Sequence, residues 1–456
     1  MLENYKIQQV LDACQPYNPI FNFAVNSMTT ISNITLDSRL AKTGDIFIAL
    51  AVGSKYNPQD YIADLTAQGI ICITSKDYPL TNNVVLVDDV ILSLGAIAQD
   101  YKTHIVDLKK QQQDNLLTIV VTGSNGKTTL KNMLTNIFIC AYGEEYICST
   151  IGNLNNQLGV PQTLLSLQLQ HKVLIVELGM NQKGEIDYLS SLVKPEIAVI
   201  NNYHHAHIGN FNNISDIIEA KNEVLNHVTT TIFINSHDNY YQQSYQYINI
   251  KNNKLKLIVV DTSIASKEVK RLGIHLQLLG HHNYANAFTA IQVAHNVNIS
   301  FQHIKQGLES YRGFPSRLEL LPIQDSALII DDSYNANLDS TLAALNVLQD
   351  FNNEQLQWVV LADLKELGDY SQKHHELIAD KLNNMQIDLL LTVGVATRFT
   401  SSKFNGNKEH FNNNQQLLSY LKRTINKNLI ILFKGSRIMN LRAEVINHLL
   451  EDKYIL

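Results

Sequence analysis

Short, continuous apolar runs separated by longer amphipathic stretches characterise the middle of the chain. The runs cover residues 116–121, 173–178, 197–201 and 230–235 and are rich in β-branched side chains. Strands that are apolar on both faces are typical of parallel sheets covered by helices on both sides. The pattern therefore predicts a helix-covered parallel sheet in this part of the chain.

The first part of the chain shows a weaker version of the same alternation. Strands are predicted at residues 45–50, 70–74 and 84–87, and together they indicate a small α/β unit. A helical stretch over 91–108 then leads into the polar run 109–115. We therefore place a domain boundary near residue 89.

The alternation restarts after Gly313-Phe314-Pro315, which marks a second boundary. Four further apolar runs predict strands of a third α/β unit, at residues 328–330, 358–361, 389–393 and 429–433. The predicted fold class is thus α/β with three domains. They are a small N-terminal α/β domain (1–88), a central parallel-sheet domain (89–314) and a C-terminal Rossmann-like domain (315–456).

Composition excludes several classes of protein. A chain of 456 residues exceeds the usual size of a single hydrophobic core. A hydrophobic share of 45% and a charged share of 17% are typical of globular proteins and exclude disorder. The net charge of -6, without a basic tract, predicts no nucleic-acid partner.

Cellular location is predicted from the cysteines and from the apolar runs. The four cysteines have unrelated spacings, which fits a reducing compartment and no metal knuckle. The first residues lack a signal-peptide pattern, and no apolar run reaches the roughly 18 residues of a membrane span. We expect a cytoplasmic protein without a membrane partner.

Candidate chemistry begins directly after the run at 116–121. The segment Thr122-Gly123-Ser124-Asn125-Gly126-Lys127-Thr128-Thr129 joins this predicted strand to a predicted helix. Backbone N–H groups of such a turn and the helix N-terminus bind phosphate, while the lysine reaches the β- and γ-phosphates and the first threonine binds Mg²⁺. Val121 stands where the longer motif has glycine. The loop predicts ATP binding and fits motors, switches, kinases and ligases alike.

Two further segments place ionisable groups at the same sheet edge. Glu177 ends the strand at 173–178, where ligands of open α/β sheets collect, and is a candidate Mg²⁺ ligand. The next strand ends in Tyr203-His204-His205-Ala206-His207. Zinc is disfavoured because no second ligand cluster matches. One histidine beside a phosphate-bound Mg²⁺ is favoured, and surface hydrogen bonding is equally compatible with His204 and His205. Lys221, read from its own segment, is a solvated helix residue.

These segments, together with others, resemble the Mur ligase family. The matching order and spacing extend from Asp37-Ser38-Arg39 to the last predicted helix. The matching motifs are residues 122–129, 152–156, 177–179, 206–207, 220–223, 282–287, 317–319, 331–337 and 434–437. The chain departs from the family at Ser54-Lys55-Tyr56, after Gly53, where Asp-Gly-His is common, and at Ala362, where glycine is expected.

The resemblance implies an ATP-dependent, ADP-forming ligase with two Mg²⁺ ions and three domains. The N-terminal domain would bind a UDP-linked substrate, the central domain would bind ATP, and the C-terminal domain would close on ATP. It implies that Lys221 is carbamylated and binds Mg²⁺ with Thr128, Glu177 and His207, and that Lys127, Lys221, His207 and Glu177 are catalytic. The implied nucleotide-binding residues are Gly123, Ser124, Asn125, Gly126, Lys127, Thr128, Thr129, Asn286, which would face adenine, Arg317, Asp332 and Asn335.

Three segments, 152–163, 177–186 and 361–368, narrow the resemblance. They resemble the family members that join D-alanyl-D-alanine to UDP-N-acetylmuramoyl-tripeptide through an acyl phosphate in peptidoglycan synthesis. These two molecules are the implied partners, and we expect a monomer. The implied substrate-binding residues are Ser38, Arg39, Asn155, Asn156, Lys434 and Arg437. For Lys434 and Arg437, contact with phosphate or the dipeptide carboxylate and a surface role are equally compatible with the sequence. The alternatives are an amide ligase of the same plan, which adds another amino acid or acts on folate, and a non-ligating ATP-dependent switch. The third residue of the tripeptide, lysine or diaminopimelate, stays open.

Overall fold

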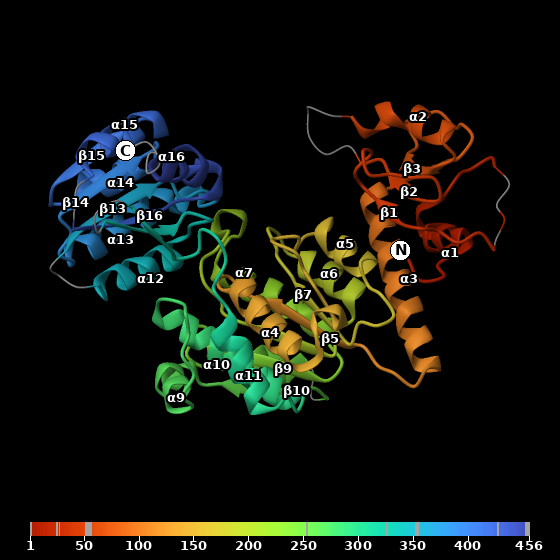
Figure 1. Ribbon diagram of the computed structural model, residues 1–456, viewed down its shortest axis with the longest axis horizontal. Coiled ribbons are helices and arrows are strands. Elements are labelled where there is room, and N and C mark those ends of the chain that lie inside the picture. The colour runs from red at the N-terminus through yellow and green to blue at the C-terminus, as the bar shows by residue number, and fades with distance from the viewer. Residues whose placement is uncertain are drawn as a thin grey trace.

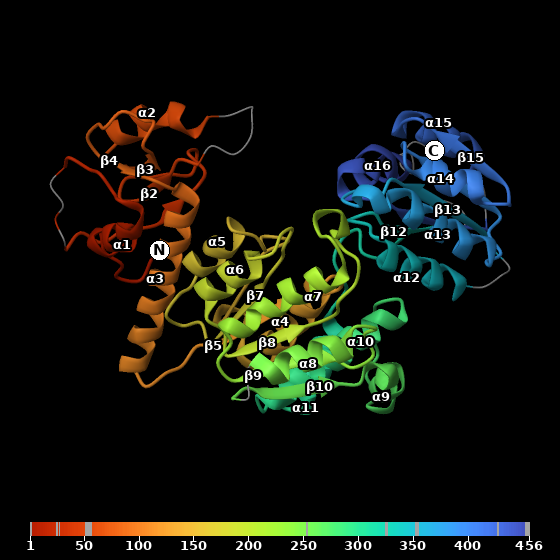
Figure 2. The same cartoon turned by 180° about the vertical axis from the view of Figure 1, so that it is seen from behind.

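Three lobes follow one another along the chain, and the first and last flank the central one (Figures 1 and 2). The structure is a computed structural model. It describes residues 2–23, 26, 28–50, 57–251, 254–323, 327–351, 355–425 and 428–451, with the side chains of 249–251 left out. The family departure at Ser54-Lys55-Tyr56 therefore lies outside the described residues, as does Gly53.

The N-terminal lobe contains a parallel sheet in the order β1-β2-β3-β4 across its described part. Its strands are β1 (Ile34–Thr35), β2 (Ile46–Ile48), β3 (Ile71–Ser75) and β4 (Val84–Val87). The predicted strands at 45–50, 70–74 and 84–87 are confirmed as β2, β3 and β4. Strand β1 was not predicted.

The central lobe contains a parallel sheet in the order β10-β9-β8-β5-β7-β6 within the described ranges. The strands are β5 (Leu117–Thr122), β6 (Ile147–Ser149), β7 (Val173–Glu177), β8 (Ile197–Ile200), β9 (Thr231–Asn235) and β10 (Lys256–Val260). The predicted strands are confirmed as β5, β7, β8 and β9. Because β5 pairs with both β7 and β8, three segments that are distant in sequence end side by side.

The C-terminal lobe contains a mixed sheet in the order β11-β12-β16-β13-β14-β15 over its described residues, with β11 antiparallel to β12. The strands are β11 (Glu319–Pro322), β12 (Leu328–Asp332), β13 (Leu356–Ala362), β14 (Leu389–Val393), β15 (Lys408–Phe411) and β16 (Leu429–Lys434). The four predicted strands are confirmed as β12, β13, β14 and β16. The last of them in sequence, β16, lies between β12 and β13.

Helices cover the sheets and connect the lobes (Figure 1). The α-helices are α1 (Ile7–Ala13), α2 (Ile62–Ala67), α3 (Val90–Gln111), α4 (Lys127–Tyr142), α5 (Gly159–Leu165), α6 (Glu185–Val193), α7 (Ile214–Asn222), α8 (Tyr241–Lys251), α9 (Ala265–Arg271), α10 (His281–Asn296), α11 (Phe301–Ser310), α12 (Leu338–Gln349), α13 (Ser371–Asn383), α14 (Thr397–Lys403), α15 (Asn414–Thr424) and α16 (Asn447–Glu451). Among the residues described, no helix combines the length and apolarity needed to cross a membrane.

Helix α3 packs against α1 of the N-terminal lobe and against α5 and α6 of the central lobe. Lys102 on this helix donates to the carbonyl oxygen of Val193 at 2.6 Å, and Tyr5 donates to Asp100 at 2.7 Å. The helix thus contacts both lobes, and the boundary near residue 89 stays a prediction, as does the boundary at 314.

Helix α4 holds the phosphate loop against the sheet. Its buried residues include Leu130, Leu134 and Phe138, spaced four apart on one helical face. Helix α11 crosses α4 closely at Gly307, where a Cβ would lie 2.5 Å from the Cα of Ile137. The lack of a side chain at Gly307 therefore sets the distance between these two helices.

Candidate active site

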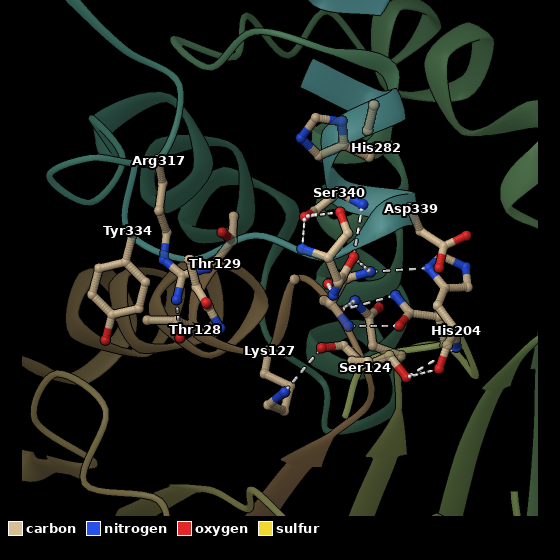
Figure 3. Close-up of a pocket in the computed structure, with 18 of the residues that line it drawn as sticks. Ser124, Lys127, Thr128, Thr129, His204, His282, Arg317, Tyr334, Asp339 and Ser340 are labelled. Atoms are coloured by element: carbon tan, nitrogen blue, oxygen red, sulfur yellow. Dashed lines mark hydrogen bonds between the residues drawn. The ribbon is translucent and has the colours of Figure 1, made fainter. Parts of the chain in front are cut away.

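A cavity of about 1430 Å³ lies between the central and C-terminal lobes. Figure 3 shows part of its wall, with residues of both lobes facing one another. The predicted site residues that line it are Ser124, Asn125, Gly126, Lys127, Thr128, Thr129, Asn155, Asn156, Glu177, His207, Lys221, Asn286, Arg317, Asp332, Asn335, Lys434 and Arg437.

Ser38 and Arg39 are not among the residues that line this cavity. They lie in a turn of the N-terminal lobe, where the Arg39 guanidinium contacts the Asp37 carboxylate at 2.6 Å. The hydrogen bonds from Arg39 hold the pKa of Asp37 at about 2. Gly123, at the start of the phosphate loop, is also not among the residues that line the cavity.

The phosphate loop connects β5 to α4 through glycines with positive φ. Gly123 has φ +143 and Gly126 has φ +75, conformations that other residues rarely adopt. A Cβ on Gly126 would lie 2.7 Å from Nδ2 of Asn201 and 2.9 Å from Oδ1 of Asn286. Two amide side chains thus pack against the loop, and only glycine fits between them.

Lys127 begins α4 and folds back over the loop. Its Nζ donates to the carbonyl oxygens of Gly123 at 2.7 Å and Ser124 at 3.1 Å. Burial lowers the pKa of Lys127, and Glu177 opposes that shift. The ammonium group is therefore enclosed with a carboxylate nearby, a setting in which a phosphate group would add favourable charge.

Glu177 ends β7 directly beside Val121 of β5 and is 1% exposed. Its Oε1 accepts a hydrogen bond from Asn155 at 2.7 Å, whereas its Oε2 is buried and has no hydrogen-bond partner among the described residues. A buried carboxylate oxygen without a partner is costly unless a cation binds it. The residues present therefore fit Mg²⁺ at this oxygen.

Lys221 lies at the end of α7 and is only 2% exposed. The interpretation of Lys221 as a solvated helix residue is therefore wrong, because a short amphipathic segment does not reveal which face meets the cavity. Within the described part of the chain its Nζ makes no hydrogen bond. Burial first, and then the charge of Lys127, lower the pKa of Lys221 well below its usual value. Its amine is thus favoured in the uncharged form.

His207 joins the central lobe to the C-terminal lobe. It begins a short 3-10 helix, η4 (Ile208–Asn210), with φ 60, and its Nδ1 lies 2.6 Å from Oε2 of Glu366. The backbone N–H of Gly209 donates to the carbonyl oxygen of Glu366 at 3.1 Å. A Cβ on Gly209 would lie 2.6 Å from the backbone nitrogen of Gly368, so the two chains touch there.

The histidines preceding His207 also contact the other segments of the site. His204 lies 3.7 Å from the carboxylate of Asp238, and the backbone N–H of His205 donates to Asp339 at 3.3 Å. The side chains of both histidines are 33% exposed. They therefore take part in contacts within and between the lobes.

The C-terminal lobe contributes Arg317, whose Nη2 donates to the Thr128 hydroxyl at 3.1 Å. Its guanidinium lies 4.2 Å from the ring centre of Tyr334 (Figure 3). Lys434 is 2% exposed and donates to Asp332 and to the carbonyl oxygen of Asn335. Arg437, in contrast, is exposed and lies 5.5 Å from the Tyr334 ring.

Asp332 is part-buried, and desolvation raises its pKa while Lys434 opposes that shift. Its second oxygen accepts a hydrogen bond from the backbone N–H of Leu318 at 3.2 Å. Lys434 therefore holds the end of β12 in place, and its ammonium group is already paired.

Several residues of the site were not singled out from the sequence. They are Asn201, Asn202, Tyr334, Asn337, Asp339 and Glu366, all of which line the cavity. Tyr334 and Asn337 belong to a segment that resembles the family motif, and Asn201 follows a predicted strand. Their contacts with other parts of the site join positions as far as 212 residues apart, so no local pattern reveals them.

Comparison with known proteins identifies the family. Residues 121–294 match the Mur ligase middle domain, and residues 316–437 match the Mur ligase, glutamate ligase domain. Together with the relatives below, these matches show that the chain belongs to the Mur ligase family and is an ATP-dependent ligase.

Three proteins that are similar to this chain over most of their length belong to one named type of Mur ligase. The UDP-N-acetylmuramoyl-tripeptide--D-alanyl-D-alanine ligase of Haemophilus influenzae is 30% identical over 93% of this chain and 94% of its own length. The Escherichia coli ligase of the same name is also 30% identical, over 90% of this chain and 91% of its own. A crystal structure of MurF from Acinetobacter baumannii superposes with a TM-score of 0.83 at 28% identity and covers 99% of both chains.

Proposed function

We propose that this chain joins D-alanyl-D-alanine to UDP-N-acetylmuramoyl-tripeptide with ATP, in the synthesis of peptidoglycan precursors. The products would be UDP-N-acetylmuramoyl-pentapeptide, ADP and phosphate. The observation that carries the proposal is the shared cavity, which places the phosphate loop, the partnerless oxygen of Glu177 and buried Lys221 together. The names of the relatives supply the two substrates.

Amide formation requires that the tripeptide carboxylate is first activated, because a carboxylate is a poor acylating agent. The terminal carboxylate of the tripeptide attacks the γ-phosphorus of ATP, and the bond to the β–γ bridging oxygen breaks to release ADP. The amine of D-alanyl-D-alanine then attacks the acyl carbon of the resulting acyl phosphate. The tetrahedral intermediate expels phosphate, and the amine loses a proton as the amide forms.

The protein's part is to position the reactants and to neutralise charge. Lys127 would contact the β- and γ-phosphates in place of the loop carbonyls that it now contacts. Thr128, Glu177, His207 and carbamylated Lys221 would hold two Mg²⁺ ions, which supply positive charge at the transferred phosphoryl group.

The proposed carbamylation of Lys221 fits the surroundings of its amine. An uncharged amine can add to CO₂ and lose a proton, which leaves an anionic carbamate. A buried ammonium beside Lys127 and two Mg²⁺ ions would be repelled, whereas a carbamate would be attracted. The burial of Lys221 and the lowered pKa of its amine support this modification.

The remaining residues would bind the substrates. Asn286 would face adenine, and Arg317, Asp332 and Asn335 would approach the nucleotide from the C-terminal lobe. Ser38 and Arg39 would contact the UDP portion, and Asn155 and Asn156 the growing peptide. Lys434 and Arg437 are the candidates for contact with phosphate or the dipeptide carboxylate, and exposed Arg437 is the better placed, because Lys434 is paired with Asp332. We infer a cytoplasmic monomer.

The deciding experiment measures ADP release from ATP by the purified protein with UDP-N-acetylmuramoyl-tripeptide. Release should require D-alanyl-D-alanine, and mass spectrometry should detect the pentapeptide product. L-alanine, D-glutamate, L-lysine and diaminopimelate serve as control amines, and a folate with glutamate tests the folate alternative. Product with another amine but none with D-alanyl-D-alanine would reassign the substrate. No amide product with any pair would favour the non-ligating switch.

A further inference from the structure

A pair of asparagine side chains joins the phosphate loop to the C-terminal lobe. Nδ2 of Asn337 donates to Oδ1 of Asn125 at 2.7 Å, and Nδ2 of Asn125 lies 3.4 Å from Oδ1 of Asn337. Both residues line the cavity and both are part-buried. The contact bridges 212 positions of sequence and two lobes.

Asn125 is tied to the central lobe through both backbone polar groups and its side-chain nitrogen. Its backbone N–H donates to Asn202 at 2.8 Å, and its carbonyl oxygen accepts from Asn201 at 2.9 Å and Asn202 at 3.0 Å. Its Nδ2 also contacts Nδ1 of His204 at 3.1 Å. A shift of the Asn125 side chain would therefore change the backbone of the phosphate loop as well.

Asn337 is fixed just as firmly in the C-terminal lobe. It caps α12: its Oδ1 accepts from the backbone N–H of Ser340 at 2.9 Å, and its own N–H donates to the Ser340 hydroxyl at 3.1 Å. Asp339 in the first turn of α12 accepts from the backbone of His205. Figure 3 shows Asp339 close to His204.

We propose that Asn337 is a positioning residue that couples docking of the C-terminal lobe to the conformation of the phosphate loop through its amide pair with Asn125. The pair has complementary donors and acceptors on two rigid supports, so it forms only when α12 is docked. Arg317, which reaches Thr128 from the same lobe, is placed by the same docking. Docking of the C-terminal lobe thereby positions the phosphate loop and the Arg317 side chain relative to each other.

The kinetic test of this role of Asn337 rests on the proposed function, because it measures the ligation rate. Asn337→Ser keeps a hydroxyl that can cap α12 but removes the amide that contacts Asn125. Asn125→Ser removes the other amide of the pair. The double variant, Asn125→Ser with Asn337→Ser, completes a double-mutant cycle. Asn413→Ser is the matched control, because Asn413 caps α15 in the same lobe by accepting from Gln416 at 3.0 Å.

We expect each single variant of the pair to lower kcat about tenfold and to change KM for ATP less than about twofold. The double variant should be no slower than the slower single variant, and Asn413→Ser should match the wild type. Unchanged kcat in Asn337→Ser, or a loss in the double variant equal to the product of the two single losses, would overturn the proposal.

Small-angle X-ray scattering provides a test that does not depend on the amine substrate. With Mg²⁺ and a non-hydrolysable ATP analogue, Asn337→Ser should have a larger radius of gyration than the wild type and than Asn413→Ser. Equal radii would contradict the coupling. If the wild type forms no pentapeptide, the proposed function fails while the scattering still decides the role of Asn337. Asn125→Ser, in the other lobe, replaces Asn337→Ser if that variant does not fold.

Discussion

Glu177 combines full burial with one oxygen that has no hydrogen-bond partner among the described residues, and this combination separates it from the other described carboxylates of the site. Glu177→Gln keeps the shape of the side chain and an oxygen that can accept from Asn155, but it removes the charge. We expect kcat to fall about a hundredfold or more, because the charge that would bind Mg²⁺ is lost.

The measurement is ligation rate against Mg²⁺ concentration. The concentration for half-maximal rate should rise in Glu177→Gln and stay unchanged in Glu219→Gln, where the replaced carboxylate forms an exposed ion pair with Lys183. An unaltered Mg²⁺ dependence in Glu177→Gln would remove this residue from the proposed metal site.

The buried side chain of His375 should make the stability of the C-terminal lobe depend on pH. It is fully buried, its Nε2 accepts from the backbone N–H of Leu364 at 3.4 Å, and its Nδ1 contacts the Thr400 hydroxyl at 3.1 Å. Burial lowers the pKa of His375 to about 4 from 6.5. Between these values the unfolded chain binds more protons than the folded one, so stability falls as the pH falls through this window.

We expect His375 to reduce the unfolding free energy of the C-terminal lobe by about 2 kcal/mol between pH 7 and pH 5. Urea unfolding followed by fluorescence measures this, since the only tryptophan of the chain, Trp358, lies in β13 of the same lobe. His375→Gln should show a correspondingly smaller loss over that interval. Equal losses in the variant and the wild type would contradict the prediction.

Residue roles were predictable from sequence where a motif is continuous and much less so where contacts are distant. The segment 122–129 can be interpreted alone, because strand, glycines and lysine are adjacent. The role of Lys221 could not be predicted from its own segment, because the burial of its side chain depends on which elements pack over α7. The Asn125–Asn337 and His207–Glu366 contacts depend on how two lobes meet, which side-chain chemistry in one segment does not encode.

At the scale of elements, most strands missed from the sequence are short or polar, and one more, β10, is a partly exposed edge strand. Strand β1 has only two residues, β6 reads Ile-Cys-Ser, and β15 reads Lys-Glu-His-Phe. Strand β11 ends in Pro322 and lies at a sheet edge, as expected for proline. Strands buried along their whole length produce apolar runs, including the edge strand β4, whereas exposed edge strands such as β15 do not, so the pattern predicts fully buried strands best.

Gly307 offers a test of helix packing. Gly307→Ala places a Cβ 2.5 Å from the Cα of Ile137, which is backbone and cannot rotate away. We expect α11 and α4 to separate and the central lobe to lose about 1–3 kcal/mol of stability. Thermal unfolding followed by circular dichroism measures the loss, and Gln306→Ala, an exposed neighbour on α11, is the control. Equal melting temperatures for both variants would contradict close packing at this crossing.

At the scale of the whole molecule, the central and C-terminal lobes contact each other at Gly209 and Gly368, and a substitution at Gly209 tests whether catalysis needs this contact. Gly209→Ala would place a Cβ 2.6 Å from the backbone nitrogen of Gly368. Docking should weaken while each lobe stays folded, and we expect kcat to fall about tenfold, equivalent to about 1.4 kcal/mol.

Urea unfolding at Trp358 should be unchanged, which separates weaker docking from unfolding of the C-terminal lobe. The exposed neighbour Asn210 provides the control variant Asn210→Ala. A Gly209→Ala protein with wild-type kcat would show that the two loops need not touch during catalysis.

The position of β16 in the C-terminal sheet has a consequence for protein synthesis. This strand pairs with β12 and β13 on either side, although it is made roughly 70 residues or more after them, and ribosomes add about 5–20 residues per second. Until residue 434 has left the ribosome, β12 and β13 lack their common neighbour. The phosphate loop, which ends about 300 residues before residue 434, thus waits about 15–60 seconds on a nascent chain for its partner lobe, and ATP turnover cannot begin on an unfinished molecule.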